Sequence, residues 1–200
     1  MEYELQLIER EPCHHGFLAL ARYRLRHELF GGGLSQVLAR ERIEPLEAAA
    51  ILLYDPAAEQ VVMVEQFRIG ALEAQAGAWL TEPVGGMIGP GESPVDVARR
   101  EADEEAGCQV TRVEPICRFY VSPGVSAERV HLFCGCCAAP ADGGVHGLAH
   151  EGEDIRVVVL DFAEAFRRVS DGRIQTTTGI IAVQWLALHH QRLRRVWLGR

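Results

Sequence analysis

The residues best suited to chemistry are three glutamates, Glu101, Glu104 and Glu105, which share a short segment with Arg100. Residues 94–107 are predicted to form a helix, with a proline in its first turn and a glycine at its end. On that helix the three carboxylates fall within one arc of about 100°. Carboxylate oxygens are the ligands that Mg²⁺ prefers in proteins. The cluster therefore suggests a divalent-cation site, although a solvated acidic face would have the same spacing.

Other features of this segment favour the cation. One stripe of the helix is expected to pack while its neighbour gathers acids, because apolar residues fill the adjacent arc of about 80°: Val95, Ala98, Ala102 and Ala106. Val97 is the exception and is expected to project among the acids. The preceding loop has glycines that let the backbone approach a ligand closely and offer carbonyl oxygens to it: Gly86, Gly89 and Gly91.

Composition excludes several classes of protein. The net charge of −8 argues against a surface that binds nucleic acid by neutralising many phosphates. All 20 basic residues are arginine, which excludes a Walker A lysine, a lysine Schiff base and a lysine general base. No apolar run reaches the roughly 18 residues that cross a bilayer, and residues 1–12 are too acidic for a signal peptide. We therefore expect a cytoplasmic protein that contacts neither nucleic acid nor membrane.

The cysteines fit neither a disulfide framework nor a zinc site. A chain with no predicted export signal should keep its thiols reduced, and no second CxxC or suitably placed histidine pair completes a zinc site. All six cysteines are therefore expected to be small buried hydrophobic residues: Cys13, Cys108, Cys117, Cys134, Cys136 and Cys137.

Periodicity predicts an α+β fold, specifically an α/β/α sandwich with mixed sheets. Residues 1–45 are expected to form an N-terminal antiparallel β segment, and residues 46–200 the main domain. Beyond the acidic helix, two helices are expected at 162–169 and 179–196. The expected strands are 17–26, 34–43, 48–54, 61–68, 79–87 with a glycine break, 109–120, 130–137 and 155–160. The glycine-rich turn at 30–33 makes the first two strands a hairpin, and residues 138–152 are expected to be a loop.

The segment 86–108 resembles the Nudix box, G-x5-E-x7-R-E-U-x-E-E-x-G-U, over its full length. Ala102 and Cys108 are smaller than the bulky aliphatic residues usual at the U positions. Every fixed position is filled: Gly86, Glu92, Arg100, Glu101, Glu104, Glu105 and Gly107. The resemblance implies a Nudix hydrolase that binds Mg²⁺ or Mn²⁺ and cleaves the pyrophosphate of a nucleoside diphosphate linked to a further group.

The resemblance also implies roles for residues of the box. Glu101 and Glu105 would be metal ligands, with Glu104 near the same cluster and the carbonyl oxygen of Gly85 as a further ligand. Arg100 would orient the glutamates. Metal ions held there would neutralise the charge that builds on the phosphoryl oxygens.

The resemblance also assigns roles to two acids of the loop at 147–154. Glu151 matches the catalytic base of the family, and Glu153 matches an additional metal ligand. In the box itself, Glu92 would tie the glycine loop to the helix. A loop that closes over bound substrate can bring such a base within reach of water only then. An ordinary acidic surface loop is the alternative.

Beyond the box, the chain resembles the bacterial ADP-ribose pyrophosphatase subgroup over nearly its whole length. Ser122-Pro123-Gly124 places its proline 15 residues after Cys108, where proline marks that subgroup. The resemblance implies that ADP-ribose is hydrolysed to AMP and ribose 5-phosphate. The residues that it suggests for substrate contact are Phe17, Arg40, Glu41, Arg68, Met87, Ser122 and Glu128.

The resemblance further implies a homodimer in which the N-terminal strands are exchanged. The hairpin at 17–43 fits this, because an isolated two-stranded hairpin is marginally stable and needs a cover. Two other functions stay open at this stage. The chain could hydrolyse other nucleoside diphosphate sugars or dinucleotides, or it could be a non-catalytic ADP-ribose sensor.

Overall fold

The computed structural model describes residues 3–148, 150 and 152–199, and the chain forms two compact units. The N-terminal unit contains the chain up to Glu47 together with Phe119–Arg129. The core unit contains Ala48–Arg118 together with the chain from Val130. Strands and α-helices are intermixed, so the predicted α+β class is confirmed.

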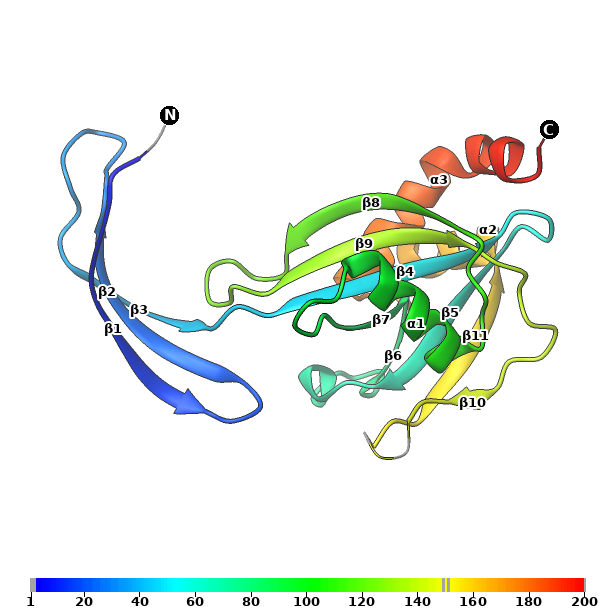
Figure 1. The fold of residues 1–200 in the computed structure, drawn as a ribbon, viewed down its shortest axis with the longest axis horizontal. Coiled ribbons are helices and arrows are strands. Elements are labelled where there is room, and N and C mark those ends of the chain that lie inside the picture. Colours follow the sequence, from blue (N-terminus) through cyan, green and yellow to red (C-terminus); the bar gives the residue numbers. More distant parts are fainter. Residues whose placement is uncertain (1–2, 149, 151, 200) are drawn as a thin grey trace. The chain divides into compact units, whose positions relative to one another are not determined.

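An antiparallel sheet of three strands forms most of the N-terminal unit. Its order is β1-β2-β3 (Figure 1), with bounds Leu5–His15, Ala19–His27 and Leu38–Ile43. Strand β2 has the predicted alternation, because Ala21 is buried while Arg22 is exposed. Strands β2 and β3 pair over six residues each, so the predicted hairpin and the predicted antiparallel N-terminal segment are confirmed.

The sequence does not predict strand β1, and the reason lies in its irregular pairing with β2. Register shifts occur between Leu7 and Glu9 and again between Pro12 and His14. Each shift changes the face that the following residues occupy, so the alternation that identifies a strand is lost. All 11 residues of β1 are also exposed, so no buried face marks the strand.

The core unit is built on an eight-stranded sheet. Six strands lie in the order β10-β11-β5-β4-β9-β8, while β6 pairs with β5 and β7 pairs with β4. The bounds are Glu47–Asp55 for β4, Gln60–Phe67 for β5, Trp79–Glu82 for β6, Val84–Met87 for β7, Arg112–Tyr120 for β8, Arg129–Cys136 for β9, Val145–His146 for β10 and Ile155–Asp161 for β11.

The predicted strand 79–87 is in fact two strands, β6 and β7. The break falls at Pro83 rather than at a glycine, because proline has no N–H to donate to a β-ladder. Gly85 and Gly86 lie inside β7 and pair with Ala50 and Ala49 of β4. The predicted loop 138–152 likewise contains a short strand, β10.

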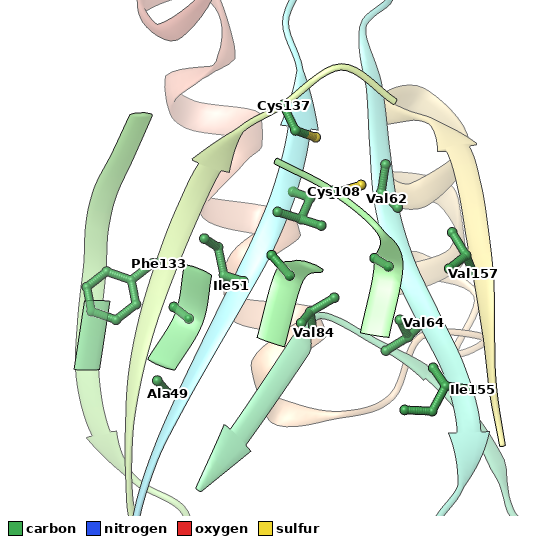
Figure 2. Packing of buried hydrophobic residues seen from close by; sticks show 14 of the residues in the cluster. Ala49, Ile51, Val62, Val64, Val84, Cys108, Phe133, Cys137, Ile155 and Val157 are labelled. Carbon is green, nitrogen blue, oxygen red and sulfur yellow. The ribbon is translucent and has the colours of Figure 1, made fainter. Parts of the chain in front are cut away.

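Helices cover both faces of this sheet, which explains its continuous apolar strands. Helix α1 (Pro94–Ala106) lies over one face, and α2 (Phe162–Ser170) and α3 (Thr177–Trp197) lie over the other (Figure 1). On β4, Ile51 belongs to the buried cluster on the α1 side, which Figure 2 shows. Tyr54 of the same strand contacts Trp197 of α3, with ring centroids 6.4 Å apart. The predicted α/β/α sandwich is therefore confirmed.

Helix α1 begins and ends where the sequence predicts. The Ser93 hydroxyl oxygen accepts a hydrogen bond from the backbone N–H of Asp96 at 3.2 Å, and Pro94 occupies the first turn. Gly107 ends the helix in the left-handed conformation, with φ 61°. Its N–H and that of the next residue donate to carbonyls of the last turn. Both ends of the helix that carries the acids are thus fixed by local bonds.

The six cysteines are free thiols, as predicted, but they are not all buried. Cys108, Cys134 and Cys137 lie in the interior, whereas Cys13 and Cys117 are exposed because both lie on exposed positions of strands β1 and β8. Among residues 3–148, 150 and 152–199, no helix is long and apolar enough to cross a membrane.

Candidate active site

The acidic stripe of helix α1 faces the interior of the core unit. Glu105 has only 2% of its surface exposed and Glu101 is largely buried, while Val97, one turn earlier, is fully buried. These three residues follow one another at intervals of four and therefore share one face of the helix. Val97 therefore lies among the acids, as expected, and the face that they share is buried. The carboxylates continue a packing face, which excludes a solvated acidic face for Glu105.

Strand β7 meets this face with glycine backbone. The N–H of Gly85 donates to Oε2 of Glu105 at 3.1 Å. At Gly86, an added Cβ would overlap the carboxylate of Glu101 and would lie 2.9 Å from its Cγ. A side chain here would thus occupy the space of that carboxylate. The two glycines of β7 let both glutamates approach the strand closely.

Arg100 holds three of the glutamates of this region. One terminal nitrogen, Nη1, lies 3.0 Å from Oε1 of Glu101 and 2.7 Å from Oε2 of Glu104. The Nε atom lies 3.6 Å from Oε1 of Glu92. The other oxygen of Glu92 accepts a hydrogen bond from the N–H of Gly89 at 2.7 Å, so that side chain joins the glycine loop to the helix. Arg100 can therefore fix the positions of these carboxylates relative to one another.

The buried carboxylates are short of positive charge. The pKa of Glu105 is raised from 4.5 to about 8: burial is the largest cause and the charges of Glu101 and Glu153 add to it, while the Gly85 N–H and the charge of Arg68 oppose it. Burial also raises the pKa of Glu101, and Arg100 opposes that shift. A buried carboxylate without a full counter-charge is costly, so an added cation would be favourable here.

The residues present fit a divalent cation of the hard type. The donors are the carboxylate oxygens of α1, and the glycines of β7 add backbone carbonyl oxygens. Oxygen donors of this kind suit Mg²⁺ or Mn²⁺ rather than zinc. No three His, Cys, Asp or Glu side chains are preassembled as a metal cage in the part of the chain that the structure describes. Since Mg²⁺ keeps several waters and shares its other ligands with substrate phosphates, a preassembled cage is not needed.

Glu153 lies close enough to this cluster for its charge to raise the pKa of both Glu101 and Glu105. A tight turn holds it, because its Oε2 accepts a hydrogen bond from the N–H of Leu148 at 2.9 Å. Glu151, the predicted catalytic base, lies outside the described residues. The structure therefore brings together five predicted residues of the core unit: Arg100, Glu101, Glu104, Glu105 and Glu153.

Arg68, predicted to contact phosphate or ribose, follows strand β5 and belongs to the same region. Its Nε donates to Oε1 of Glu82 at 2.6 Å, and its charge also acts on Glu105. The sequence did not single out Glu82, because its contact with Arg68 joins two positions that are 14 residues apart. Met87, another predicted contact, is half-exposed at the end of β7.

The remaining predicted contacts lie in the N-terminal unit, where two of them share a cavity. Arg40 and Glu41 line a cavity of about 380 Å³, and residues 124–125 of the segment 122–126, called the proline loop below, line it too. Two backbone hydrogen bonds hold that loop against β3: the N–H of Ile43 donates to the carbonyl of Val125 at 2.9 Å, and that of Ala127 donates back to Ile43 at 3.1 Å. The fold therefore joins two segments that are distant in sequence.

Three predicted contacts stand apart from this cavity. The carbonyl of Ser122 accepts bonds from two N–H groups of the loop and closes its turn, and Glu128 lies at the end of the same loop. Phe17 lies in the turn between β1 and β2 with 94% of its surface exposed. Phe17 does not line the cavity, but its exposed ring is free to stack on the aromatic ring of a ligand.

Comparison with known proteins gives a consistent result. The NUDIX domain profile matches residues 44–191. The chain is 45% identical to an ADP-ribose pyrophosphatase of Escherichia coli K12 over 97% of this chain and 93% of that protein. It is 38% identical to an ADP-ribose pyrophosphatase of Haemophilus influenzae (98% and 92%) and 32% identical to a GDP-mannose pyrophosphatase of Pectobacterium atrosepticum (92% and 94%).

A solved structure agrees on the fold. The crystal structure of an ADP compounds hydrolase superposes with a TM-score of 0.69 over 93% of this chain and 96% of that one, at 16% sequence identity. Identity this low shows the shared fold alone, whereas the profile match and the relatives above 30% identity concern the sequence. Together with the acidic helix and its glycine strand, they show that this chain belongs to the NUDIX domain family.

Proposed function

We propose that the chain is an ADP-ribose pyrophosphatase, which hydrolyses ADP-ribose to AMP and ribose 5-phosphate with Mg²⁺ as cofactor and Mn²⁺ as an alternative. The observation that carries the proposal is the pair Glu101 and Glu105. These two largely buried carboxylates lie close to the glycines of β7, within the segment that matches the NUDIX domain. The names of the two relatives with the higher identities support ADP-ribose as the substrate.

In this proposal the core unit supplies the metal ligands. Glu101, Glu105 and Glu153 hold the metal with the carbonyl oxygen of Gly85, and Glu104 lies beside them through its bond to Arg100. When bound, the metal neutralises charge on the phosphoryl oxygens of the substrate. Arg100 keeps the glutamates in place before the cation arrives, so less ordering is needed on binding.

Metal binding should depend on pH because Glu105 must lose a proton first. The pKa of Glu105 in the metal-free protein is about 8, so below that pH the metal displaces a proton and binds more weakly. Metal affinity is expected to rise with pH up to about 8 and then to level off. Calorimetric titration in two buffers of different ionisation enthalpy measures the released proton. Glu105→Gln is the control, and equal proton release from it would contradict this assignment.

Glu151 is proposed as the general base that takes the proton of the attacking water. Glu151→Gln is expected to lower turnover by about 100-fold or more while metal binding is retained, since a general base contributes roughly that much. Turnover and Mg²⁺ affinity are measured on the same preparation. Asp154→Asn, an acid of the same loop, is the matched control. Turnover within about twofold of the parent chain would rule out this role for Glu151.

Substrate contacts are proposed for seven residues, each considered within its own unit. Arg68 contacts phosphate or ribose and Met87 lies beside the metal ligands, while Ser122 and Glu128 contact the ribose. Arg40 and Glu41 contact the adenosine part, with Phe17 as a stacking face. The cavity that Arg40 and Glu41 share with the proline loop supports the roles of these two residues.

We also propose that the chain acts as a homodimer through its N-terminal unit. Strand β1 exposes apolar side chains that a second copy would cover: Leu5, Leu7 and Ile8. A long exposed edge strand is a liability unless something pairs with it. Light scattering coupled to gel filtration should give twice the mass of the chain. The cytoplasmic location predicted from the sequence stays a prediction.

Product analysis tests which bond is broken. If the pyrophosphate is cleaved, chromatography detects AMP and ribose 5-phosphate in equal amounts. Release of ADP and free ribose would contradict the proposal, because it places the cleavage at the sugar. GDP-mannose is the most informative alternative substrate, since a relative at 32% identity is named for it. ADP-ribose that binds without any product would indicate a sensor.

A further inference from the structure

Glu82 and Arg68 form a fixed pair next to the acidic cluster. Glu82 is the last residue of β6, pairs with Val64 of β5, and has 8% of its surface exposed. Arg68 follows β5, and its backbone N–H donates to the carbonyl of Ala78 at 2.8 Å. The side chains are joined by a hydrogen bond from Nε of Arg68 to Oε1 of Glu82 at 2.6 Å. The backbone of both residues is therefore fixed by the pairing of β5 with β6.

Of this pair, mainly the arginine is accessible to solvent. The side chain of Glu82 is 11% exposed, whereas that of Arg68 is 46% exposed. The bond uses Nε of the guanidinium, and a guanidinium carries further donors on its two terminal nitrogens. Those donors form the planar fork that suits two phosphate oxygens. A pair with a buried anion and an accessible cation is arranged to offer the cation to a ligand.

The effect of Arg68 on neighbouring pKa values indicates where a ligand of its guanidinium would lie. Arg68 lowers the pKa of Glu82 and also that of Glu105 on α1, so the guanidinium is near both carboxylates. Without Glu82, Arg68 would be free to turn toward the carboxylates of α1, where it would compete with a cation. A bond to Glu82 prevents this and leaves the fork beside the metal ligands.

We propose that Glu82 is a positioning residue, which holds Arg68 so that its terminal nitrogens bind the pyrophosphate of the substrate next to the metal ligands of α1. The proposal rests on the proposed function, because it takes a diphosphate as the ligand of Arg68. Glu82 itself does not touch the substrate. Its effect must therefore disappear when Arg68 is replaced, which distinguishes positioning from a structural role.

The test is a double-mutant cycle with Glu82→Gln and Arg68→Gln. Glu82→Gln keeps the shape of the side chain but makes the acceptor neutral, which weakens the bond. We expect KM for ADP-ribose to rise about tenfold with kcat changed by less than about twofold, because binding of the diphosphate is weakened in ground and transition states alike. In the Arg68→Gln background the same change should raise KM by less than about twofold.

Thr81→Val is the matched control, since Thr81 is the neighbouring residue of β6, equally buried, and outside the site. It should leave KM and kcat unchanged. Circular dichroism checks that each variant folds, and Arg68→Met replaces Arg68→Gln if the latter does not. The proposal is overturned if Glu82→Gln raises KM equally in both backgrounds, or leaves it unchanged in the parent chain.

Binding of inorganic pyrophosphate, measured by calorimetry, keeps the test independent of turnover. We expect Glu82→Gln to raise the Kd for pyrophosphate about tenfold in the parent chain and by less than about twofold in the Arg68→Gln background. If the parent chain hydrolyses no ADP-ribose, the proposed function fails while this binding cycle still decides the role of Glu82. An unchanged Kd would overturn the positioning role even if hydrolysis is observed.

Discussion

Replacing Glu105 by glutamine is expected to lower metal-dependent turnover of ADP-ribose by about 100-fold or more. Glu105 is 2% exposed and its carboxylate is already bonded to the N–H of Gly85 at 3.1 Å. Glutamine can keep that bond and fill the same volume, but it brings no negative charge to a cation. The variant should therefore fold normally, lose affinity for Mg²⁺, and lose turnover with it.

The helix provides a matched control for this variant. Asp103 lies on the same helix and is exposed, and the only side-chain hydrogen bond it has among the described residues is from Nε2 of Gln109 to its Oδ1 at 2.6 Å. Asp103→Asn makes the same chemical change outside the acidic cluster and should leave turnover within about twofold of the parent chain. Steady-state kinetics at saturating Mg²⁺ compare the two variants. Equal losses would show that Glu105 has no special part in binding the metal.

Gly86→Ala is expected to have an effect of comparable size, through geometry rather than charge. The new Cβ would overlap the carboxylate of Glu101, and β7 cannot easily move away because Gly86 pairs with Ala49 of β4. The side chain of Glu101 must therefore leave its position beside the strand. A displacement of about 1 Å at a catalytic group can lower the rate by about 100-fold.

Gly70→Ala is the control for this change. No atom lies within 4 Å of the position of an added Cβ at Gly70, and its φ does not require glycine. It should keep full turnover, while Gly86→Ala should lose both turnover and part of its affinity for Mg²⁺. Kinetics and calorimetric titration of the two alanine variants provide the comparison. If Gly86→Ala turns over normally, the close approach of Glu101 to β7 has no part in activity.

Much of the fold follows from local sequence signals. The helix α1 could be predicted to the residue at both ends because Ser93, Pro94 and Gly107 each have a local reason to be there. Strand β1 could not, because two register shifts remove its alternation. The division of residues 79–87 into two strands was missed because the glycines of β7 stay in the ladder, whereas Pro83 leaves it.

The chemistry of the site was easier to predict than its surroundings. The spacing of the acids identified the helix face and placed Val97 on it, but periodicity alone could not show that the sheet would cover this face and bury both Val97 and Glu105. Glu82 acquires its importance from a contact with Arg68, 14 residues away in sequence, and no local signal marks such a contact. Tertiary pairing across β5 and β6 creates it.

Metal-dependent hydrolysis of ADP-ribose is tested most directly by kcat/KM across a panel of substrates, with Mg²⁺ and after its removal by a chelator. The panel contains ADP-ribose, ADP-glucose, GDP-mannose, NADH and diadenosine polyphosphates. We predict that ADP-ribose exceeds every other substrate by about tenfold or more and that chelation abolishes turnover. A higher value for GDP-mannose or a dinucleotide, or turnover that survives chelation, would contradict the account.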